Sequence, residues 1–226
     1  MKEFKALIFD VDGTMAETEE LHRQAFNDSF AKFGLDWNWD VDLYARLLRI
    51  TGGRERISHF LAEYRSDKDA LSVAQIADLH GMKNRRYAEL LVDGRCPLRA
   101  GVADVIAIAR QRGQRLAIAT TTSRANIAAL LSRIMGQSWP DLFHAVVAGE
   151  DVARKKPAPD AYVKVVESLG LPAQACLAFE DSRNGLLAAQ SAGVPVVITR
   201  SMYFGHDNFE GALKVVDDLA ELVDLP

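Results

Sequence analysis

Two carboxylates at alternate positions follow the first apolar run of the chain. Asp10 and Asp12 come directly after Ala6-Leu7-Ile8-Phe9, and Gly13 follows them. In an extended strand a residue and its second neighbour point the same way, and glycine lets the chain turn at once, so both acids can address one ligand. Two carboxylates buried together are costly unless a cation or a shared proton compensates them. The pattern therefore predicts a divalent metal and chemistry at the end of a buried strand.

Further polar clusters follow later apolar runs. The hydroxyl row Thr120-Thr121-Thr122-Ser123 is suited to hold phosphate oxygens with its side chains and backbone N–H groups. Lys156, in Lys155-Lys156-Pro157, offers a cation that can neutralise a nucleophile and a phosphate together. Another run ends in Glu180-Asp181. Because open α/β sheets bind ligands beyond the carboxyl ends of their strands, we expect these clusters to converge.

The spacing of apolar residues indicates the elements that must position these clusters. Short buried runs predict strands over residues 5–10, 115–120, 145–149, 175–181, 195–199 and 214–217. Helical periodicity falls between them, over residues 102–111, 124–134, 159–169, 182–192 and 218–223. This alternation predicts an α/β fold, with a Rossmann-like doubly wound parallel sheet covered by helices on both faces.

The segment after the first strand has a different pattern, charged and helical, with no convincing strand. We expect it to form an inserted α-helical cap domain over residues 16–92, while residues 1–15 and 93–226 form the catalytic core. Gly52-Gly53 interrupts the insert, residues 36–40 are expected to connect two of its helices, and residues 93–97 are expected to form the return linker.

Composition restricts the possible functions. The 226 residues carry a net charge of -4, with 49% hydrophobic and 26% charged residues, which is typical of a soluble globular protein. Such a charge gives no basic field for nucleic acid or anionic lipid. Cys96 and Cys176 are isolated, so neither a disulfide framework nor a zinc site is indicated. Without a leader or a membrane-length apolar run, we expect a cytoplasmic monomer that binds a small molecule, and no nucleic-acid or membrane partner.

The order of the motifs resembles the haloacid dehalogenase superfamily: Asp-x-Asp-Gly-Thr after the first strand, then Thr, Lys-Pro and Glu-Asp after later ones. The insert is similar to the cap of the phosphoglucomutase-like branch. Three segments look like the CbbY-type phosphatases, which remove a phosphate from xylulose 1,5-bisphosphate, an inhibitory by-product of Rubisco. These segments are residues 10–22, residues 51–57 and residues 119–123. The resemblance implies a Mg²⁺-dependent sugar-phosphate phosphatase.

The resemblance also implies the roles of core residues. Asp10 is the nucleophile that forms an aspartyl-phosphate, and Asp12 protonates the leaving alkoxide and then deprotonates water. A halide leaving group needs no proton, so Asp12 favours phosphate chemistry over dehalogenation. Thr120 holds a phosphoryl oxygen; an N-cap of the following helix is the plain alternative, and the two roles are compatible with each other. Lys156 is preferred to Lys155 as the partner of Asp10, because the superfamily lysine directly precedes proline.

The same resemblance implies a Mg²⁺ site. Asp181 is the expected direct ligand, together with the side chain of Asp10 and the backbone carbonyl of Asp12, since this hard ion prefers oxygen donors. Glu180 either binds the ion directly or contacts a group that does. The sequence leaves both possibilities open.

A bisphosphate needs a second anion site, and Gly52-Gly53 opens a helix whose first turn carries Arg54 and Arg56. A solvated helix start is the plain alternative. Further candidates for substrate contact are Lys83, Thr121, Ser123, Arg124 and Asn126. The resemblance adds candidates for the sugar hydroxyls, each of which would otherwise be a packed residue: Glu17, His22 and Tyr44. We expect the other histidines and Trp37, Trp39 and Trp139 to be structural.

Two other functions remain open. A β-phosphoglucomutase would use the same aspartyl-phosphate but return the phosphoryl group to a sugar instead of water. The Thr-Gly-Gly-Arg loop and the Thr-Thr-Thr-Ser row favour the phosphatase. A binding or scaffold protein could retain the fold without turnover, but it would not require the complete set of four motifs.

Overall fold

The computed structural model describes residues 1, 3–65, 70–93 and 96–223 of the chain. The described residues form a six-stranded parallel sheet with strand order β3-β2-β1-β4-β5-β6. Its strands are β1 (Ala6–Phe9), β2 (Arg115–Ala119), β3 (Ala145–Val147), β4 (Cys176–Glu180), β5 (Val196–Thr199) and β6 (Lys214–Val216). Each lies within a segment predicted as a strand, and every pair of neighbours is parallel.

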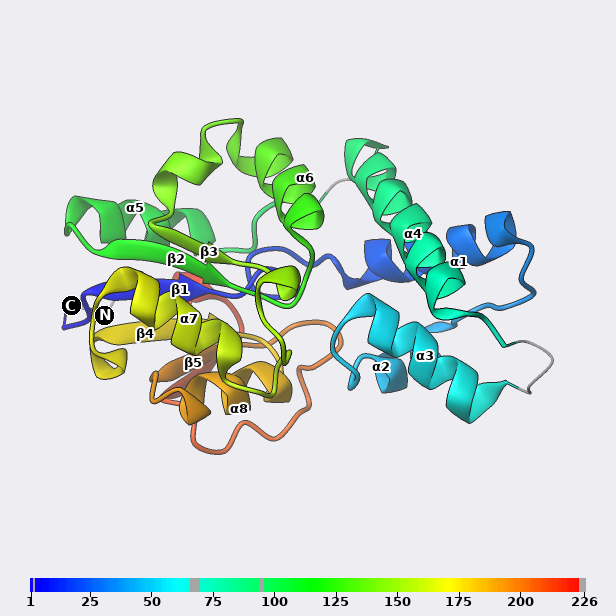
Figure 1. Ribbon diagram of the computed structural model, residues 1–226. Helices are drawn as coiled ribbons and strands as arrows, with labels where there is room; N and C mark the ends of the chain where they lie inside the picture. Colours follow the sequence, from blue (N-terminus) through cyan, green and yellow to red (C-terminus); the bar gives the residue numbers. More distant parts are fainter. Residues whose placement is uncertain (2, 66–69, 94–95, 224–226) are drawn as a thin grey trace.

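Helices cover both faces of this sheet, as Figure 1 shows. One face carries α5 (Val102–Gln111) and α6 (Arg124–Met135), and the other carries α7 (Asp160–Leu169) and α8 (Arg183–Ser191). Successive residues of β1 point to opposite faces, so that Leu7 and Phe9 join one hydrophobic cluster and Ala6 and Ile8 join the other. The predicted α/β doubly wound fold is confirmed.

One predicted helix is wrong in type. Residues 218–223 contain only the short 3-10 helix η5 (Leu219–Leu222), which starts where the side chain of Asp218 accepts a hydrogen bond from the N–H of Ala220. Leu219 and Leu222 are buried in the core cluster that also contains α5. Four residues provide a single turn, which tertiary packing rather than helical propensity holds in place.

The insert between β1 and α5 is helical, and its described residues form no strand. It contains α1 (Glu19–Phe33), α2 (Val41–Leu47), α3 (Gly53–Tyr64) and α4 (Val73–Asp93). In Figure 1 these helices lie together beyond the carboxyl ends of the strands. They share an aromatic cluster that includes Phe26, Phe30, Trp37, Trp39 and Phe60. The division into separate domains at residues 16–92 stays a prediction, and residues 94 and 95 of the expected return linker lie outside the described residues.

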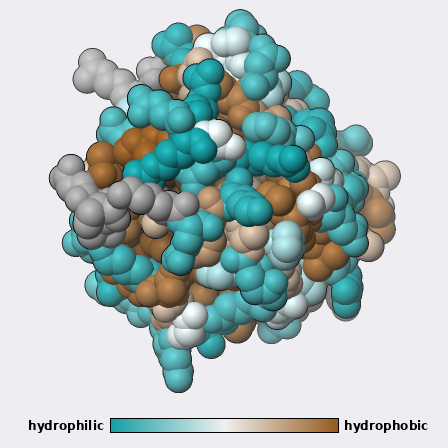
Figure 2. All heavy atoms as spheres, turned by 90° about the vertical axis from the view of Figure 1, so that its left-hand side faces the viewer, coloured by the Kyte–Doolittle hydropathy of each residue, from teal (hydrophilic) through white to brown (hydrophobic). Residues whose placement is uncertain are grey.

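The surface far from the insert is mixed in polarity. Figure 2 views the molecule from the end where β1 begins, and hydrophobic patches there are separated by hydrophilic side chains. Such a mixture is ordinary for a folded protein surface. In the described ranges, no helix is long and apolar enough to cross a membrane.

Candidate active site

A cavity of about 470 Å³ lies between the carboxyl ends of the strands and the helical insert. Both parts of the chain contribute to its lining, as the sheet topology and the insert position require. The predicted site residues that line it are Asp10, Asp12, His22, Gly52, Gly53, Arg54, Arg56, Lys83, Thr120, Thr121, Ser123, Asn126, Lys156, Glu180 and Asp181. The expected convergence of the separate motifs is therefore confirmed.

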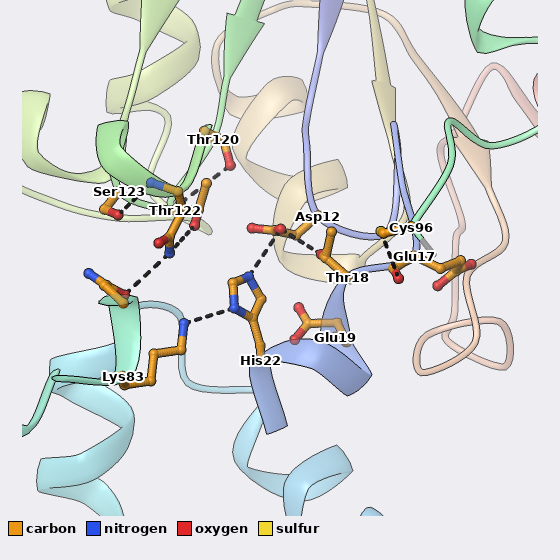
Figure 3. Close-up of polar contacts among 12 residues, drawn as sticks. Asp12, Glu17, Thr18, Glu19, His22, Lys83, Cys96, Thr120, Thr122 and Ser123 are labelled. Carbon is orange, nitrogen blue, oxygen red and sulfur yellow. Dashed lines mark hydrogen bonds and ion pairs between the residues drawn. The ribbon is translucent and has the colours of Figure 1, made fainter. Parts of the chain in front are cut away.

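Glu17 is a predicted substrate-binding residue that does not line the cavity. Its carboxylate accepts a hydrogen bond from the backbone N–H of Met202 and lies 3.6 Å from Nε of Arg99. Figure 3 shows this side chain directed away from the space around Asp12 and Lys83. The carboxylate contacts the core instead.

Tyr44 and Arg124 are also outside the cavity lining. The hydroxyl of Tyr44 donates to Glu19 at 2.8 Å, which places the buried ring behind a carboxylate that does face the cavity. Arg124 is exposed at the start of α6 and pairs with Asp151. The sequence predicts that Glu17, Tyr44 and Arg124 contact the substrate, but none of the three lines the cavity. Spacing along the sequence does not fix the direction of these side chains.

The end of β1 is tied to its neighbours through Asp10. The backbone N–H of Asp10 donates to the carbonyl of Phe179, and Nζ of Lys156 lies 2.6 Å from Oδ1 of Asp10. The same ammonium donates to the carbonyl of Ala119 at 2.9 Å and to Oε1 of Glu180 at 2.5 Å. One buried lysine thus joins the ends of β1, β2 and β4, and the predicted contact between Lys156 and Asp10 is confirmed.

Lys155 has a different partner. Its Nζ lies 2.6 Å from Oε1 of Glu55, in the first turn of α3. The two adjacent lysines therefore point to different parts of the molecule: Lys156 to the buried carboxylates of the core and Lys155 to the insert.

Three carboxylates gather where β1 and β4 end. Asp10, Glu180 and Asp181 each offer a ligand atom, and these atoms all lie within 4.8 Å of one another. Oε2 of Glu180 and Oδ2 of Asp181 are buried and have no hydrogen-bond partner in the part of the chain that the structure describes. Buried oxygens of this kind are costly without a partner. The donor set fits a hard divalent cation such as Mg²⁺.

The protonation of these carboxyl groups leads to the same conclusion. Burial raises the pKa of Asp10 to about 8; Lys156 opposes this rise, and the charge of Glu180 adds to it. Burial also raises the pKa of Asp181 well above its ordinary value, and the charges of Asp10 and Glu180 raise it further. The positive charge of Lys156 does not balance the three acids, so added positive charge would favour their ionised forms.

Asp12 belongs to the core loop, but residues leading into and within the insert hold its carboxylate. Its Oδ1 accepts a hydrogen bond from Thr18 at 2.5 Å and lies 3.2 Å from Nε2 of His22. Nζ of Lys83, on α4, lies 2.8 Å from Nδ1 of the same imidazole. Figure 3 shows this chain of contacts from α4 through α1 to Asp12. Because an ionised carboxylate only accepts hydrogen bonds, the proton of His22 lies on Nε2 and is donated to Asp12, while Nδ1 faces the amine of Lys83.

These contacts set the charge of Asp12. Burial alone would raise its pKa, but His22, Thr18 and Lys83 together lower the pKa to about 2, so the carboxylate is ionised at neutral pH. Burial and the nearby Lys83 lower the pKa of His22, which favours the neutral imidazole. Burial lowers the pKa of Lys83 to about 7. In this arrangement Asp12 has the form of a general base.

The hydroxyl groups of the row after β2 have different hydrogen-bond partners. Thr120 is buried at the cavity, and its hydroxyl accepts a hydrogen bond from the N–H of Thr122. Ser123 is the N-cap of α6, because its side chain accepts from the N–H of Asn126 at 3.2 Å. The alternative that Thr120 caps this helix is wrong. Asn126 also donates to Asn84 of α4 at 3.3 Å, so the row meets the insert.

The insert presents positive charge to the cavity. Arg56 is held by hydrogen bonds to the carbonyls of Leu47 and Ile50, each at 3.2 Å, which argues against a freely solvated helix start. The guanidinium of Arg54 has no hydrogen-bond partner among the described residues and borders the cavity. Lys83 adds a buried amine. This wall can receive an anion opposite Asp10.

The cavity also has lining residues that the sequence does not predict: Glu19, His80, Asn84 and Phe204. His80, which is expected to be structural, borders the cavity. A Cβ on Gly53 would come within 2.4 Å of its Nε2, so this glycine is needed for the close approach of α3 to α4. Burial and the charges of Lys83 and Arg54 lower the pKa of His80 to about 3. The sequence carries no local signal for His80, since its place depends on how two helices pack.

Comparison with known proteins agrees with this geometry. The family model for haloacid dehalogenase-like hydrolases matches residues 4–193. Protein CbbY of Rhodobacter capsulatus is 52% identical over 219 residues, which cover 96% of this chain and 95% of that protein.

Two crystal structures of CbbY from Rhodobacter sphaeroides are also similar to the chain. One is in complex with phosphate and has a TM-score of 0.92 at 46% identity; the other, a mutant in complex with xylulose 1,5-bisphosphate, has a TM-score of 0.93 at 45% identity. Each comparison covers 97% of this chain and 96% of the other. The motifs, the fold and these matches together show that the chain belongs to the haloacid dehalogenase-like hydrolase family.

Proposed function

We propose that this hydrolase is a Mg²⁺-dependent sugar-phosphate phosphatase that acts through Asp10, with xylulose 1,5-bisphosphate as its substrate. The proposal rests on one observation: Asp10, Lys156, Glu180 and Asp181 meet in a cavity whose insert side carries Arg54, Arg56 and Lys83. Among the described residues, one oxygen each of Glu180 and Asp181 has no hydrogen-bond partner. The similarity to CbbY structures in complex with phosphate and with xylulose 1,5-bisphosphate supports the substrate class. Hydrolysis of this compound would remove an inhibitor of Rubisco.

The Mg²⁺ site would be formed by Asp10, Asp181 and the backbone carbonyl of Asp12. Oε1 of Glu180 is held by Lys156, so only Oε2 is left for a metal ion or for a water bound to one. A bound Mg²⁺ supplies positive charge to the carboxylates and to the phosphate oxygens. Direct and water-mediated binding by Glu180 both use this free oxygen.

The first half of the reaction transfers the phosphoryl group to the enzyme. A carboxylate oxygen of Asp10 attacks phosphorus, and the bond from phosphorus to the sugar oxygen breaks. Lys156 compensates the charge on Asp10 and the phosphoryl group, while Thr120 donates a hydrogen bond to a phosphoryl oxygen. Asp12 gives a proton to the leaving alkoxide. This step needs the acid form of Asp12, which the negative charge of an arriving phosphate favours by raising its pKa.

The second half releases phosphate. The ionised Asp12 takes a proton from water, whose oxygen attacks the phosphorus of the aspartyl-phosphate. The bond from phosphorus to Asp10 breaks, which regenerates the carboxylate and forms inorganic phosphate. The contacts of Asp12 with Thr18 and His22 orient its carboxylate for both proton transfers.

The second phosphate of the substrate is assigned to the insert. Arg54 and Arg56 of α3, the backbone of Gly52-Gly53 and the amine of Lys83 form the cationic wall. Thr121, Ser123 and Asn126 border the space between the two walls and remain candidates for sugar contacts. His22 borders the same space, but both of its ring nitrogens face protein groups. A ligand with negative charge at both ends fits this distribution of positive groups.

Phosphate release from pentulose and hexose mono- and bisphosphates, compared by kcat/KM with Mg²⁺ and with EDTA, tests the proposal. We expect the highest value for xylulose 1,5-bisphosphate with Mg²⁺, and no turnover by Asp10→Asn. Conversion of glucose 1-phosphate to glucose 6-phosphate without net phosphate release would identify a mutase instead. A folded wild-type protein that turns over no phosphoester would indicate a binding protein.

A further inference from the structure

The loop that carries Lys156 is held from two sides. On its inner side, the ammonium of Lys156 pairs with Asp10. On its outer side, the hydroxyl of Thr51 donates to the backbone carbonyl of Lys156, and Glu55 pairs with Lys155 at 2.6 Å. Thr51 and Glu55 belong to the insert, so the insert grips the same short loop that supplies the cation beside the nucleophile.

Gly52 allows this grip to be close. Its φ is +93°, and a Cβ on it would come within 2.2 Å of Oε2 of Glu55 and 2.6 Å of Nζ of Lys155. A larger residue would therefore be strained in its backbone and would also displace the ion pair. The glycine backbone lies directly against both charged groups, so the pair is part of a tight contact.

The strength and placement of the ion pair limit what it can do. The side chains of Lys155 and Glu55 are 23% and 47% exposed, so solvent screens their attraction and the pair adds little to the stability of the fold. The two residues are separated by 100 positions in the sequence and lie in the core and the insert respectively. Because it joins the insert to the core loop, the pair instead favours one position of the insert over that loop.

We infer that Thr51, Glu55 and Lys155 are positioning residues that form a clamp, which sets Lys156 in its working position when the insert covers the cavity. The inference rests on the proposed function, because it concerns the same reaction. Lys156 serves the phosphoryl group of every substrate, so weakening the clamp should lower kcat for large and small substrates alike. This distinguishes the clamp from Arg54, whose assigned partner is the second phosphate alone.

A competing role for Lys155 makes a different prediction. If Lys155 bound the second phosphate directly, Glu55 would compete with the substrate for its ammonium. Removing the charge of Glu55 would then leave bisphosphate turnover unchanged or improve it, whereas removing Lys155 would impair bisphosphates only.

The test compares Glu55→Gln, Lys155→Met, the double variant and the charge exchange Glu55→Lys/Lys155→Glu. Steady-state kinetics are measured with Mg²⁺ on xylulose 1,5-bisphosphate and on p-nitrophenyl phosphate. We expect each single variant to lower kcat about three- to fivefold on both substrates with little change in KM, as suits a partly exposed ion pair. The kcat of the double variant should be no lower than that of the slower single variant. The charge exchange should regain at least half of the kcat that the single variants lose.

Arg154→Gln is the matched control. Arg154 immediately precedes Lys155 and pairs with Asp160 at 2.7 Å, but both of these residues belong to the core. The kcat of Arg154→Gln should equal that of the wild type on both substrates. Thermal melting of every variant should stay within about 2 °C of the wild type, which shows that the rates compare folded proteins.

The inference is overturned if Glu55→Gln keeps the wild-type rate while Lys155→Met loses only bisphosphate turnover. It is equally overturned if the charge exchange is as slow as the double variant. Failure of the proposed substrate is a separate result: a wild-type protein that does not hydrolyse xylulose 1,5-bisphosphate refutes that assignment, while the p-nitrophenyl phosphate rates still test the clamp.

Discussion

Nζ of Lys156 lies 2.6 Å from Oδ1 of Asp10, and the two side chains are only 4% and 9% exposed. The same ammonium also contacts Glu180, which is buried at 1% exposure. Breaking a buried ion pair of this kind destabilises the fold, because removal of one partner leaves a charge without water or counterion. The lysine therefore has a structural consequence as well as a chemical one.

Lys156→Met should abolish phosphate release and lower the free energy of unfolding by about 3–5 kcal/mol, since Asp10 and Glu180 lose their common partner. Urea denaturation measures the stability and a phosphate assay measures the activity. Lys155→Met is the control; the loss of its partly exposed ion pair with Glu55 should change the free energy of unfolding by less than about 1 kcal/mol. Equal losses of stability in the two variants would contradict the assigned burial of the Lys156 pair.

Removal of one acidic ligand should separate metal binding from folding. Mg²⁺ at about a hundred times its Kd should stabilise the metal-stripped wild type by about 2.7 kcal/mol. Asp181→Asn should lose this increase, yet melt at or above the temperature of the metal-free wild type, because it removes one of three crowded carboxylates. Calorimetry with EDTA and with Mg²⁺ gives both values. An undiminished Mg²⁺ response in the variant would exclude Asp181 as a ligand.

The buried amine of Lys83 predicts a pH dependence of stability. Its pKa is about 7 in the folded state, below its ordinary value of 10.5. Between these values the unfolded chain binds more protons than the folded one, so the contribution of Lys83 to stability rises with pH. Relative to Lys83→Met, the wild type should gain about 2 kcal/mol in free energy of unfolding from pH 7 to 9. Lys32→Met, at the exposed end of α1, is the control, and its difference from the wild type in free energy of unfolding should change little with pH. The prediction for Lys83 is refuted if the difference between the wild type and Lys83→Met does not change from pH 7 to 9.

The hydrogen bond from His22 should support proton transfer more than substrate binding. His22→Phe keeps a ring that can stack on Tyr87, which lies at a centroid distance of 4.0 Å, but removes the Nε2 donor to Asp12. We expect kcat to fall about 10- to 100-fold, the range for a lost hydrogen bond to a charged group. Stopped-flow and pH–rate measurements give the readout. A change confined to KM would show that the imidazole contacts the substrate instead.

Arg54 should discriminate bisphosphates from simpler esters. Arg54→Ala should reduce kcat/KM for xylulose 1,5-bisphosphate at least tenfold while sparing p-nitrophenyl phosphate, because only the former has a second phosphate. Arg46→Ala, an exposed arginine at the end of α2 that does not line the cavity, is the control for net charge. Equal losses on both substrates would argue against a second phosphate at Arg54.

The core half of the site could be predicted from the sequence because parallel strands bring their carboxyl ends to one edge. Asp10, Thr120 and Asp181 each follow a buried apolar run, and these runs form β1, β2 and β4 respectively. The three strands are neighbours in the sheet, with β1 between the other two. Strand order was not needed for the prediction, since any order of a parallel sheet leaves these residues at the same edge.

The insert half could be predicted only in outline. Glu17 and Glu19 lie two positions apart, but only Glu19 faces the cavity, because the direction of each side chain depends on how the chain enters α1. His80 and Asn84 reach the cavity through the packing of α4 against its neighbours. Neither local spacing nor residue type encodes such contacts, which depend on helix orientation in three dimensions.

Asp10 is anchored by the sheet, whereas Asp12 is anchored by Thr18, His22 and, through the imidazole, Lys83. Grafting the helices of another family member onto this sheet would therefore replace the acid–base environment along with the selectivity. We expect such hybrids to be slow in both half-reactions, because Asp12 transfers a proton in each of them. The two reactive carboxylates are thus oriented by different parts of the chain, Asp10 by the sheet and Asp12 by the insert and the segment that leads into it.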